Sequence, residues 1–294
     1  MTSARRGGPS GTTVFCTAAA LVAFAANSVL CRLALGRVAI DAASFSTLRL
    51  ASGSLALLIL SRGLRSGPSP VGGSWGSAAL LFLYAVPFSF AYITLSAGTG
   101  ALILFGSVQA TMLTAALGTG ERPHPLHWVG LGLALAGLVV LVLPGLQSPS
   151  LSGAVLMAVG GISWGIYSLR GRGPAGPLAE TTGNFIRALP LALAVSLLSL
   201  RHLHVGARGA VLAVMSGAVA SGVGYVLWYA ALKGLSATRA AAVQLSVPVL
   251  AAAGGVMVLA ESVSLRLVAA AILILGGVAL ALAGRERRPG ARSG

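Results

Sequence analysis

The stretch SATRAAAVQLSVPVLAAAGGVMVLAESVSLRLVAAAILILGGVALAL, residues 236–282, decides the fold of this chain. It consists of two apolar runs that meet at a single acidic residue, Glu261. A weaker copy, GTGERPHPLHWVGLGLALAGLVVLVL, occupies residues 118–143 and places Glu121 at the matching position. This repetition of an acidic residue between apolar runs predicts that the chain consists of two related halves.

The composition indicates that lipid surrounds the chain. Apolar residues make up 56% of the 294 residues, charged residues make up 9%, and the mean hydropathy is +0.91. Such a small polar surface cannot cover a soluble globule. The formal charge of +15 does not predict a nucleic-acid partner, because the basic residues lie in short loops and tails. Bases that flank membrane spans account for it.

The two cysteines offer no disulfide or metal site. Cys16 and Cys31 fall in the same apolar run and are too far apart on one helix to bond to each other. The sequence has no CxxC motif and no Cys/His cluster. We therefore expect neither a structural metal nor a cofactor.

Ten apolar runs of about 18 to 24 residues predict ten transmembrane helices, because backbone polar groups in hydrocarbon must be paired within a helix. The runs cover residues 14–35, 44–61, 75–95, 99–118, 126–144, 151–169, 183–200, 209–232, 238–260 and 265–284. The predicted fold is therefore all-α and integral to the membrane.

The distribution of basic residues predicts the orientation. With the N-terminus in the cytoplasm, the inside loops and tails hold twelve Lys and Arg residues and the outside loops hold five. Both ends are then cytoplasmic. Five helices in each half make the second half enter the membrane in the opposite orientation, which is an inverted repeat. The expected boundaries are a tail at 1–13, repeats at 14–144 and 151–284, and a basic tail at 285–294.

The predicted repeat register pairs polar residues as well as apolar ones. Arg49 falls opposite Arg187, and Tyr92 falls opposite Tyr229. Both arginines begin near the edges of their predicted spans. We expect them to anchor the helices by reaching the interface, with carboxylate binding as the alternative.

Three segments resemble the EamA-type ten-helix permeases of the drug/metabolite transporter superfamily. They are ISWGIYSLRGR at 162–172, LSATRAAAVQLSVPVLAAAGG at 235–255 and AESVSLRLVAAAILILGGV at 260–278. The first half departs from the pattern, because ALILFGSVQATML at 101–113 has no proline matching Pro248 and no tryptophan lies near Asn27. The resemblance implies a multi-pass transporter of the bacterial inner membrane, most similar to exporters of amino acids, including aromatic ones.

Aromatic and amide residues inside the predicted spans are the candidates for substrate binding, because such transporters bind substrate near the midplane between their halves. Rings can stack on a planar group, and amides suit the ends of a zwitterion. Helix packing, an interfacial aromatic belt or interhelical hydrogen bonds are the alternative interpretation. The candidates are Asn27, Tyr84, Phe88, Tyr92, Gln109, Trp164, Tyr167, Tyr225, Trp228, Tyr229 and Gln244.

Four further residues are expected to be structural. Glu121 and Glu261 each precede a helix, so we expect each carboxylate to cap the N-terminus of that next helix, with a direct part in coupling as the alternative. Pro87 and Pro248 lie within predicted helices, where a missing N–H bends or breaks the helix.

The sequence therefore predicts an exporter of aromatic or bulky apolar amino acids that works by alternating access, as a monomer or homodimer in contact with lipid. The acids and histidines fall in loops, tails and helix ends, so we expect no proton relay in mid-membrane. Export of another metabolite or a drug is the alternative. A membrane enzyme is disfavoured, because the chain contains no HExxH motif, no GxSxG motif and no paired intramembrane acids.

Overall fold

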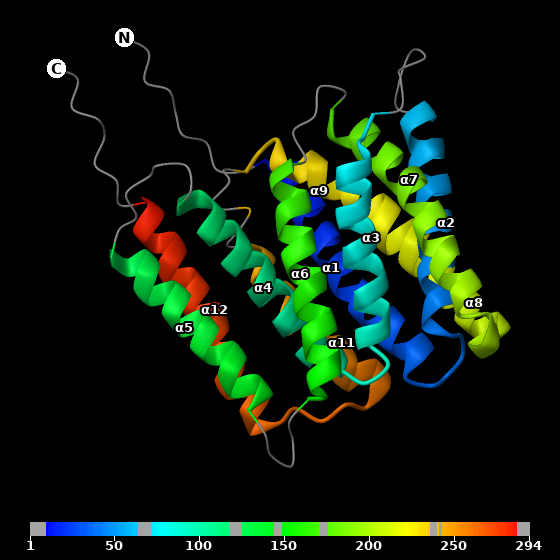
Figure 1. Ribbon diagram of the computed structural model, residues 1–294. Helices are drawn as coiled ribbons and strands as arrows, with labels where there is room; N and C mark the ends of the chain where they lie inside the picture. The colour runs from blue at the N-terminus through cyan, green and yellow to red at the C-terminus, as the bar shows by residue number, and fades with distance from the viewer. Residues whose placement is uncertain are drawn as a thin grey trace, which may run out of the picture.

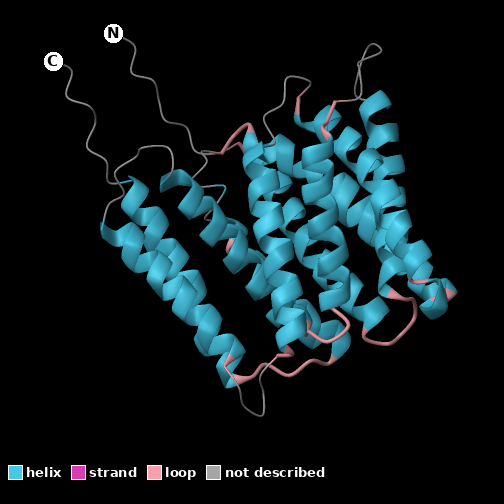
Figure 2. Ribbon diagram, in the orientation of Figure 1, coloured by secondary structure: helices cyan, strands magenta, loops and turns pink. Residues whose placement is uncertain are grey.

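The computed structural model describes residues 10–63, 72–117, 125–143, 149–170, 176–235, 240 and 243–286. Almost all of this part of the chain is helical, and Figure 2 shows the loops gathered at two opposite ends of the helices. Glu121 and the outer parts of both predicted tails lie outside the described residues.

Ten helical rods make up the described part of the chain, and they run alternately up and down in Figure 1. Their elements are α1 (Gly11–Leu35), α2 (Ala42–Gly63), α3 (Trp75–Ala91), α4 (Ala97–Leu117), α5 (Pro125–Val142), α6 (Leu151–Arg170), α7 (Pro177–Leu198), α8 (Ala207–Val214), η2 (Met215–Val223), α9 (Gly224–Leu232), α11 (Val247–Leu259) and α12 (Leu265–Glu286). Helices α8, η2 and α9 form one continuous rod, and the short 3₁₀ turn η1 (Leu200–His202) precedes it.

The direction of the rods confirms the predicted all-α membrane fold. The start of α1 and the end of α12 lie on the same side, at the top of Figure 1. We call this the terminal side and the opposite one the distal side. The first rod, α1, and the sixth, α6, run in opposite directions (Figure 1), which is the relation that the predicted inverted repeat requires. Which side faces the cytoplasm, and where each repeat begins and ends, stay predictions.

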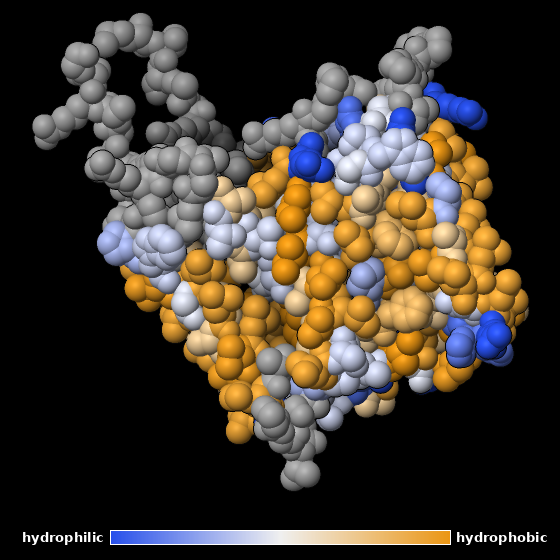
Figure 3. All heavy atoms as spheres, viewed as in Figure 1, coloured by the Kyte–Doolittle hydropathy of each residue, from blue (hydrophilic) through white to orange (hydrophobic). Residues whose placement is uncertain are grey.

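The outer surface is suited to lipid. Large apolar side chains such as Phe15, Leu198 and Met257 are exposed. Figure 3 shows hydrophobic residues covering most of the middle of the visible face, with the most hydrophilic residues near its upper and lower rims. Within the described residues, five rods are both long and apolar enough to cross a membrane, and five shorter helices are also apolar.

Glycines bring α5 and α12 into backbone contact. A Cβ atom on Gly130 would clash with the carbonyl oxygen of Gly277, and one on Gly277 would lie 2.7 Å from the Ala134 nitrogen. Neither helix could approach so closely with a larger residue at these positions. In contrast, Gly132 and Gly276 have open space around them, so only some of the glycines of this helix pair are needed for packing.

Two of the predicted helices are irregular. The eighth rod contains a π-helix, η2, and the predicted unbroken helix 238–260 is wrong: residues 245–246 form a turn, and α11 begins at Val247. Pro248 lies in the first turn of α11. Its ring cannot donate a hydrogen bond to the preceding turn and clashes with that turn's carbonyl, so the helix must restart there.

A loop-to-loop contact ties the halves together on the distal side. The carboxylate of Asp41 accepts hydrogen bonds from the backbone N–H of Ser44, at 2.8 Å, and from that of His204, at 3.1 Å. The Asp41 N–H donates to the His204 carbonyl, and Ile40 forms a β-bridge with Val205. Asp41 thus begins α2 and fastens it to the segment that leads into α8.

Candidate substrate site

A narrow cavity lies inside the bundle between helices of both halves. Side chains of α1, α3 and α4 face those of α6 and α9 across it. The cavity encloses about 20 Å³, room for about one water molecule. Sites for drug-sized ligands usually measure about 300 to 1,000 Å³, so the structure shows this site closed. It is lined by Phe24, Asn27, Tyr84, Phe88, Leu104, Phe105, Trp164 and Tyr225.

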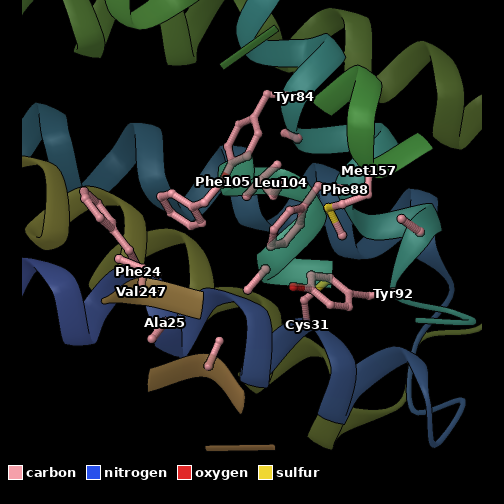
Figure 4. Close-up of a cluster of buried hydrophobic side chains, with 14 of the residues drawn as sticks. Phe24, Ala25, Cys31, Tyr84, Phe88, Tyr92, Leu104, Phe105, Met157 and Val247 are labelled. Carbon is pink, nitrogen blue, oxygen red and sulfur yellow. The ribbon is translucent and has the colours of Figure 1, made fainter. Parts of the chain in front are cut away.

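Aromatic rings from both halves meet at the cavity. Trp164 of α6 stacks on Tyr225 of α9, with ring centroids 5.2 Å apart and an angle of 14° between the planes. Tyr84 of α3 lies 4.9 Å from Trp164, and Phe24 of α1 lies 5.9 Å from Tyr225. The view in Figure 4 shows Phe24, Tyr84, Phe88 and Phe105 gathered at the α1, α3 and α4 wall. A planar or bulky apolar group that enters the cavity would replace ring-to-ring contacts with contacts of its own.

Local sequence spacing places these rings. Tyr84 and Phe88 are four residues apart on α3, so they share one face, and their centroids lie 5.5 Å apart. On α6, a Cβ atom on Gly161 would lie 2.5 Å from the Leu104 carbonyl oxygen. This close approach of α6 to α4 brings Trp164 against the wall of the cavity.

Asn27 is the amide in the cavity wall, and the π-helix holds it. Its Oδ1 accepts a hydrogen bond of 2.7 Å from the Ser216 hydroxyl, and its Nδ2 donates to the Ser221 oxygen at 3.3 Å. Both serines belong to η2. A π-helix is wider than an α-helix and often marks a functional site. Here it turns two buried hydroxyls toward one amide of the opposite half.

Arg49 lies against the same wall and is almost completely buried, with 2% of its surface exposed. Its Nη2 donates a hydrogen bond of 2.9 Å to the Tyr84 hydroxyl. Its guanidinium carbon lies 5.2 Å from the centre of the Tyr84 ring and 4.7 Å from that of Phe88. Nη1 has no hydrogen-bond partner among the described residues. A buried cation that is only partly paired costs several kcal/mol, roughly, in other proteins.

A second set of contacts closes the distal side. Arg32 of α1 forms an ion pair with Glu261, with 3.2 Å between Nε and Oε1, and its Nη1 donates to the Tyr92 and Ile93 carbonyls. The other oxygen of Glu261 accepts a 2.8 Å hydrogen bond from the Ala97 N–H. The cation therefore meets the C-terminal carbonyls of α3, and the anion meets the first amide of α4, as helix dipoles favour.

On the terminal side, three residues on one face of α7 hold the segment before α3. Glu180 accepts from the Gly73 N–H at 2.7 Å, and Asn184 accepts from the Ser74 N–H at 2.9 Å. Arg187 donates from Nη1 to the Gly72 carbonyl at 2.7 Å and to the Gly183 carbonyl at 3.1 Å. These bonds give Arg187 a structural role outside the cavity.

The model of the EamA-like transporter family matches residues 151–283, which span α6 to α12. The chain belongs to the EamA-like transporter family. An uncharacterized protein of Pseudomonas aeruginosa is 50% identical over 286 residues, which cover 96% of this chain and 100% of that protein. A protein of known crystal structure shares the fold, with a TM-score of 0.61 and 22% identity over 92% of this chain and 99% of that one.

As a member of the EamA-like transporter family, the protein is a multi-pass membrane transporter of the drug/metabolite transporter superfamily. The resemblance seen in the sequence is therefore confirmed at the level of family and fold. The crystallographic neighbour adds only the fold, because its sequence identity is low.

The structure of this EamA-like transporter brings five of the eleven candidate binding residues to the cavity: Asn27, Tyr84, Phe88, Trp164 and Tyr225. Of the remaining six, Tyr92 and Trp228 extend the chain of rings, Tyr167 stacks on Trp164 while its hydroxyl accepts from Asn184, and Tyr229 pairs with the Thr181 hydroxyl. Gln109 is buried in α4, and Gln244 is half-buried in the helical residues just before the turn at 245–246.

The expectation that Glu261 caps the helix that follows it in the sequence is wrong. Glu261 caps α4, a helix of the other half, rather than α12, whose first turn is capped by the Ser264 hydroxyl at 3.1 Å from the Leu267 N–H. Ala260 adopts a left-handed conformation with φ 54° and ends α11. The carboxylate of Glu261 consequently lies over Gly255, where a Cβ atom would be 2.5 Å from Oε2. Pro87 lies inside α3, as expected.

The sequence interpretation missed four residues at the site. Phe24, Leu104 and Phe105 line the cavity, but they are apolar residues in apolar helices, where nothing distinguishes them from lipid-facing positions. The spacing of Phe24 three residues before Asn27 is a usable signal, because both then share one helix face. Arg49 was expected at the interface. The structure corrects this, because the side chain is buried among the rings rather than extended to water.

Proposed function

We propose that this transporter exports amino acids with aromatic or bulky apolar side chains across the bacterial inner membrane. The observation that carries the proposal is the Trp164–Tyr225 stack, which faces Tyr84 and Phe88 across the cavity. Four rings from three helices surround one small space. A flat or bulky apolar side chain is the substrate group that such a wall binds best.

The proposed mechanism is alternating access between the two five-helix halves. The cavity is closed in this structure, so the substrate must enter by a movement of one half relative to the other. The distal contacts of Arg32 with Glu261 and of Asp41 with His204 cross between elements of both halves. They would have to break when the cavity opens to the distal side.

The proposed transport does not use a mid-membrane carboxylate or histidine relay. Among the described residues, Asp41, Glu180 and Glu261 all lie at helix ends, where N–H groups bind them. Imposing a pH gradient on liposomes should therefore leave the exchange rate unchanged. A strict requirement for that gradient would contradict this part of the proposal.

The test of the function is counterflow in liposomes that contain the purified transporter and unlabelled phenylalanine. Labelled phenylalanine, tryptophan and leucine should accumulate, whereas labelled lysine and glutamate should not. Accumulation of none of the three apolar amino acids would reject the proposal and leave another metabolite or a drug as the substrate.

A matched pair of variants tests the site. Tyr225→Leu removes the ring that stacks on Trp164, whereas Tyr229→Leu changes the same residue type one helical turn later, facing Thr181. An aromatic stack contributes about 0.5 to 1.5 kcal/mol. The Tyr225 variant should therefore raise the KM for tryptophan roughly 2- to 10-fold, and the Tyr229 variant should not. If both variants changed the KM equally, the cavity could not be assigned as the binding site.

A further inference from the structure

The guanidinium of Arg49 is a buried positive charge next to the cavity, and no described carboxylate pairs with it. The side chain is 2% exposed, and its Nη1 lacks a hydrogen-bond partner within the described residues. The titratable side chains near it include Tyr84, Tyr225 and Cys31, and none of these is a carboxylate. The Tyr84 hydroxyl, which accepts a hydrogen bond from Nη2, and the rings of Tyr84 and Phe88 stabilise the cation only in part.

The three acids whose side chains the structure describes bind other groups. Asp41 binds the N–H groups of Ser44 and His204, Glu180 binds the Gly73 N–H, and Glu261 binds Arg32 and the Ala97 N–H. Each of these carboxylates lies at the end of a helix rather than at the cavity. An anion that pairs with Arg49 must therefore come from outside the described part of the protein.

The position of Arg49 fits a ligand contact. Tyr84 and Phe88 line the cavity, and the guanidinium lies over both rings. A carboxylate that entered beside the Tyr84 hydroxyl would reach a cation that already holds that hydroxyl at 2.9 Å. Guanidinium groups bind carboxylates through two parallel N–H bonds. Pairing with Nη1 would satisfy the donor that the closed structure leaves unpaired.

We propose that Arg49 binds the carboxylate of the transported molecule, and that the substrate class is an organic monoanion with an aromatic or bulky apolar body whose α-amino group is not required. This inference rests on the proposed function and narrows it. An amino acid meets the requirement through its α-carboxylate. No cation lines the cavity itself, and Arg49 lies next to it, over the rings of Tyr84 and Phe88. One guanidinium matches one negative charge rather than the two of a phosphate ester.

The cavity offers an amino group only weak partners. No carboxylate lines it, and the Oδ1 of Asn27 already accepts one hydrogen bond from Ser216, so an ammonium group would find the second lone pair of this amide, phenol oxygens and ring faces. The other lining residues are rings or apolar side chains, with the phenols of Tyr84 and Tyr225 as neutral hydroxyls. The ammonium group would also be repelled by Arg49 unless the carboxylate lay between them.

A purely structural role for Arg49 does not explain these contacts. The structural arginines of this chain donate to several oxygens: Arg187 to two carbonyls, and Arg32 to two carbonyls and a carboxylate. An apolar side chain of similar volume would pack a buried position at lower cost than an unpaired cation.

The test compares three competitors of the exchange of labelled phenylalanine: phenylalanine, 3-phenylpropionate, which lacks the amino group, and phenethylamine, which lacks the carboxylate. In the wild-type transporter, 3-phenylpropionate should compete within about threefold of phenylalanine, and phenethylamine should be at least about tenfold weaker. Arg49→Met should abolish this preference, and Arg49→Lys should weaken it. Arg187→Met is the matched control and should keep it.

Three results of the competition test would overturn the inference: equal competition by phenethylamine in the wild type, failure of 3-phenylpropionate to compete, or an unchanged carboxylate preference in Arg49→Met. The wild-type panel tests the carboxylate requirement even where the Met variant does not fold. A thermal shift separates the two proposals. If labelled phenylalanine does not exchange but 3-phenylpropionate raises the Tm of the wild type and not of Arg49→Met, the amino acid substrate is wrong and the role of Arg49 stands. No thermal shift with any of the three compounds, together with no exchange, would reject both.

Discussion

Arg49 and Arg187 occupy matching positions in the predicted repeat, on the neighbouring helices α2 and α7, and they have opposite surroundings. Arg187 is half-buried and donates to two backbone carbonyls, so it holds the segment that leads into α3. Arg49 is fully buried, bonds one phenol and leaves Nη1 unpaired among the described residues. Of the two arginines that the predicted repeat register pairs, only Arg187 therefore belongs to the framework.

The largest expected effect is a difference in unfolding free energy between variants of the two arginines. Arg187→Met should lower the free energy of unfolding by about 1.5 to 3 kcal/mol, because it removes charge-assisted hydrogen bonds to the backbone. Arg49→Met should not lower it, because the change removes a buried cation and keeps the packing volume. Thermal unfolding in detergent measures both.

A control belongs with this pair. Arg201 is exposed, so Arg201→Met should change the unfolding free energy by less than about 0.5 kcal/mol. If Arg49→Met destabilises the protein as much as Arg187→Met does, then Arg49 is a framework residue and the contrast between the helices fails.

Breaking the ion pair between Arg32 and Glu261 should lower the free energy of unfolding by a smaller amount. Arg32 is the third buried or half-buried arginine of the comparison. Glu261→Ala removes both the α4 cap and the pair, and should cost about 1 to 2 kcal/mol. Glu261→Gln keeps an oxygen for the Ala97 N–H, so it should cost less than about 1 kcal/mol. Both groups remain partly exposed. Equal losses in the two variants would mean that the pair, and not the cap, stabilises this end.

The smallest expected effect depends on pH. Burial acts to raise the pKa of Asp41, but hydrogen bonds from Ser44, His204 and Ala43 outweigh it and lower the pKa below its usual value. A lowered pKa in the folded state stabilises the fold above the unfolded pKa, and this contribution disappears as the pH falls through the folded value. The Tm difference between the wild type and Asp41→Asn should therefore be full at neutral pH and shrink below about pH 4.

The same titration applied to Arg187→Met sharpens the comparison, because a guanidinium stays charged throughout this range. Its Tm difference from the wild type should not follow the titration of Asp41. A parallel loss of both differences in acid would indicate general acid unfolding and not the titration of one carboxylate.

Hydropathy and ring spacing were enough to predict the helices and part of the site. The ten apolar runs correspond to the ten rods. The presence of aromatic residues within these runs was enough to identify four residues of the cavity, Tyr84, Phe88, Trp164 and Tyr225. These signals are local: a span needs a minimum apolar length, and residues four apart share a face. Such signals survive without knowledge of which helices pack together.

Other features depend on contacts between distant parts of the chain, and the sequence did not reveal them. Glu261 precedes α12 in sequence but binds the first amide of α4, because the turn at Ala260 directs it back over α11. Arg49 lies near the start of an apolar run, where a long side chain ordinarily reaches water. Its burial depends on α3 packing over it. The π-helix η2 follows no pattern that separates it from an α-helix of the same composition.

The closed cavity has a consequence for any measured affinity. A space for about one water molecule means that the substrate binds only after the helices separate. The apparent dissociation constant is then the intrinsic one divided by the fraction of molecules that are open. A substitution far from the rings that favours the open form, for example by loosening the distal contacts, would tighten apparent binding without adding a single contact to the substrate.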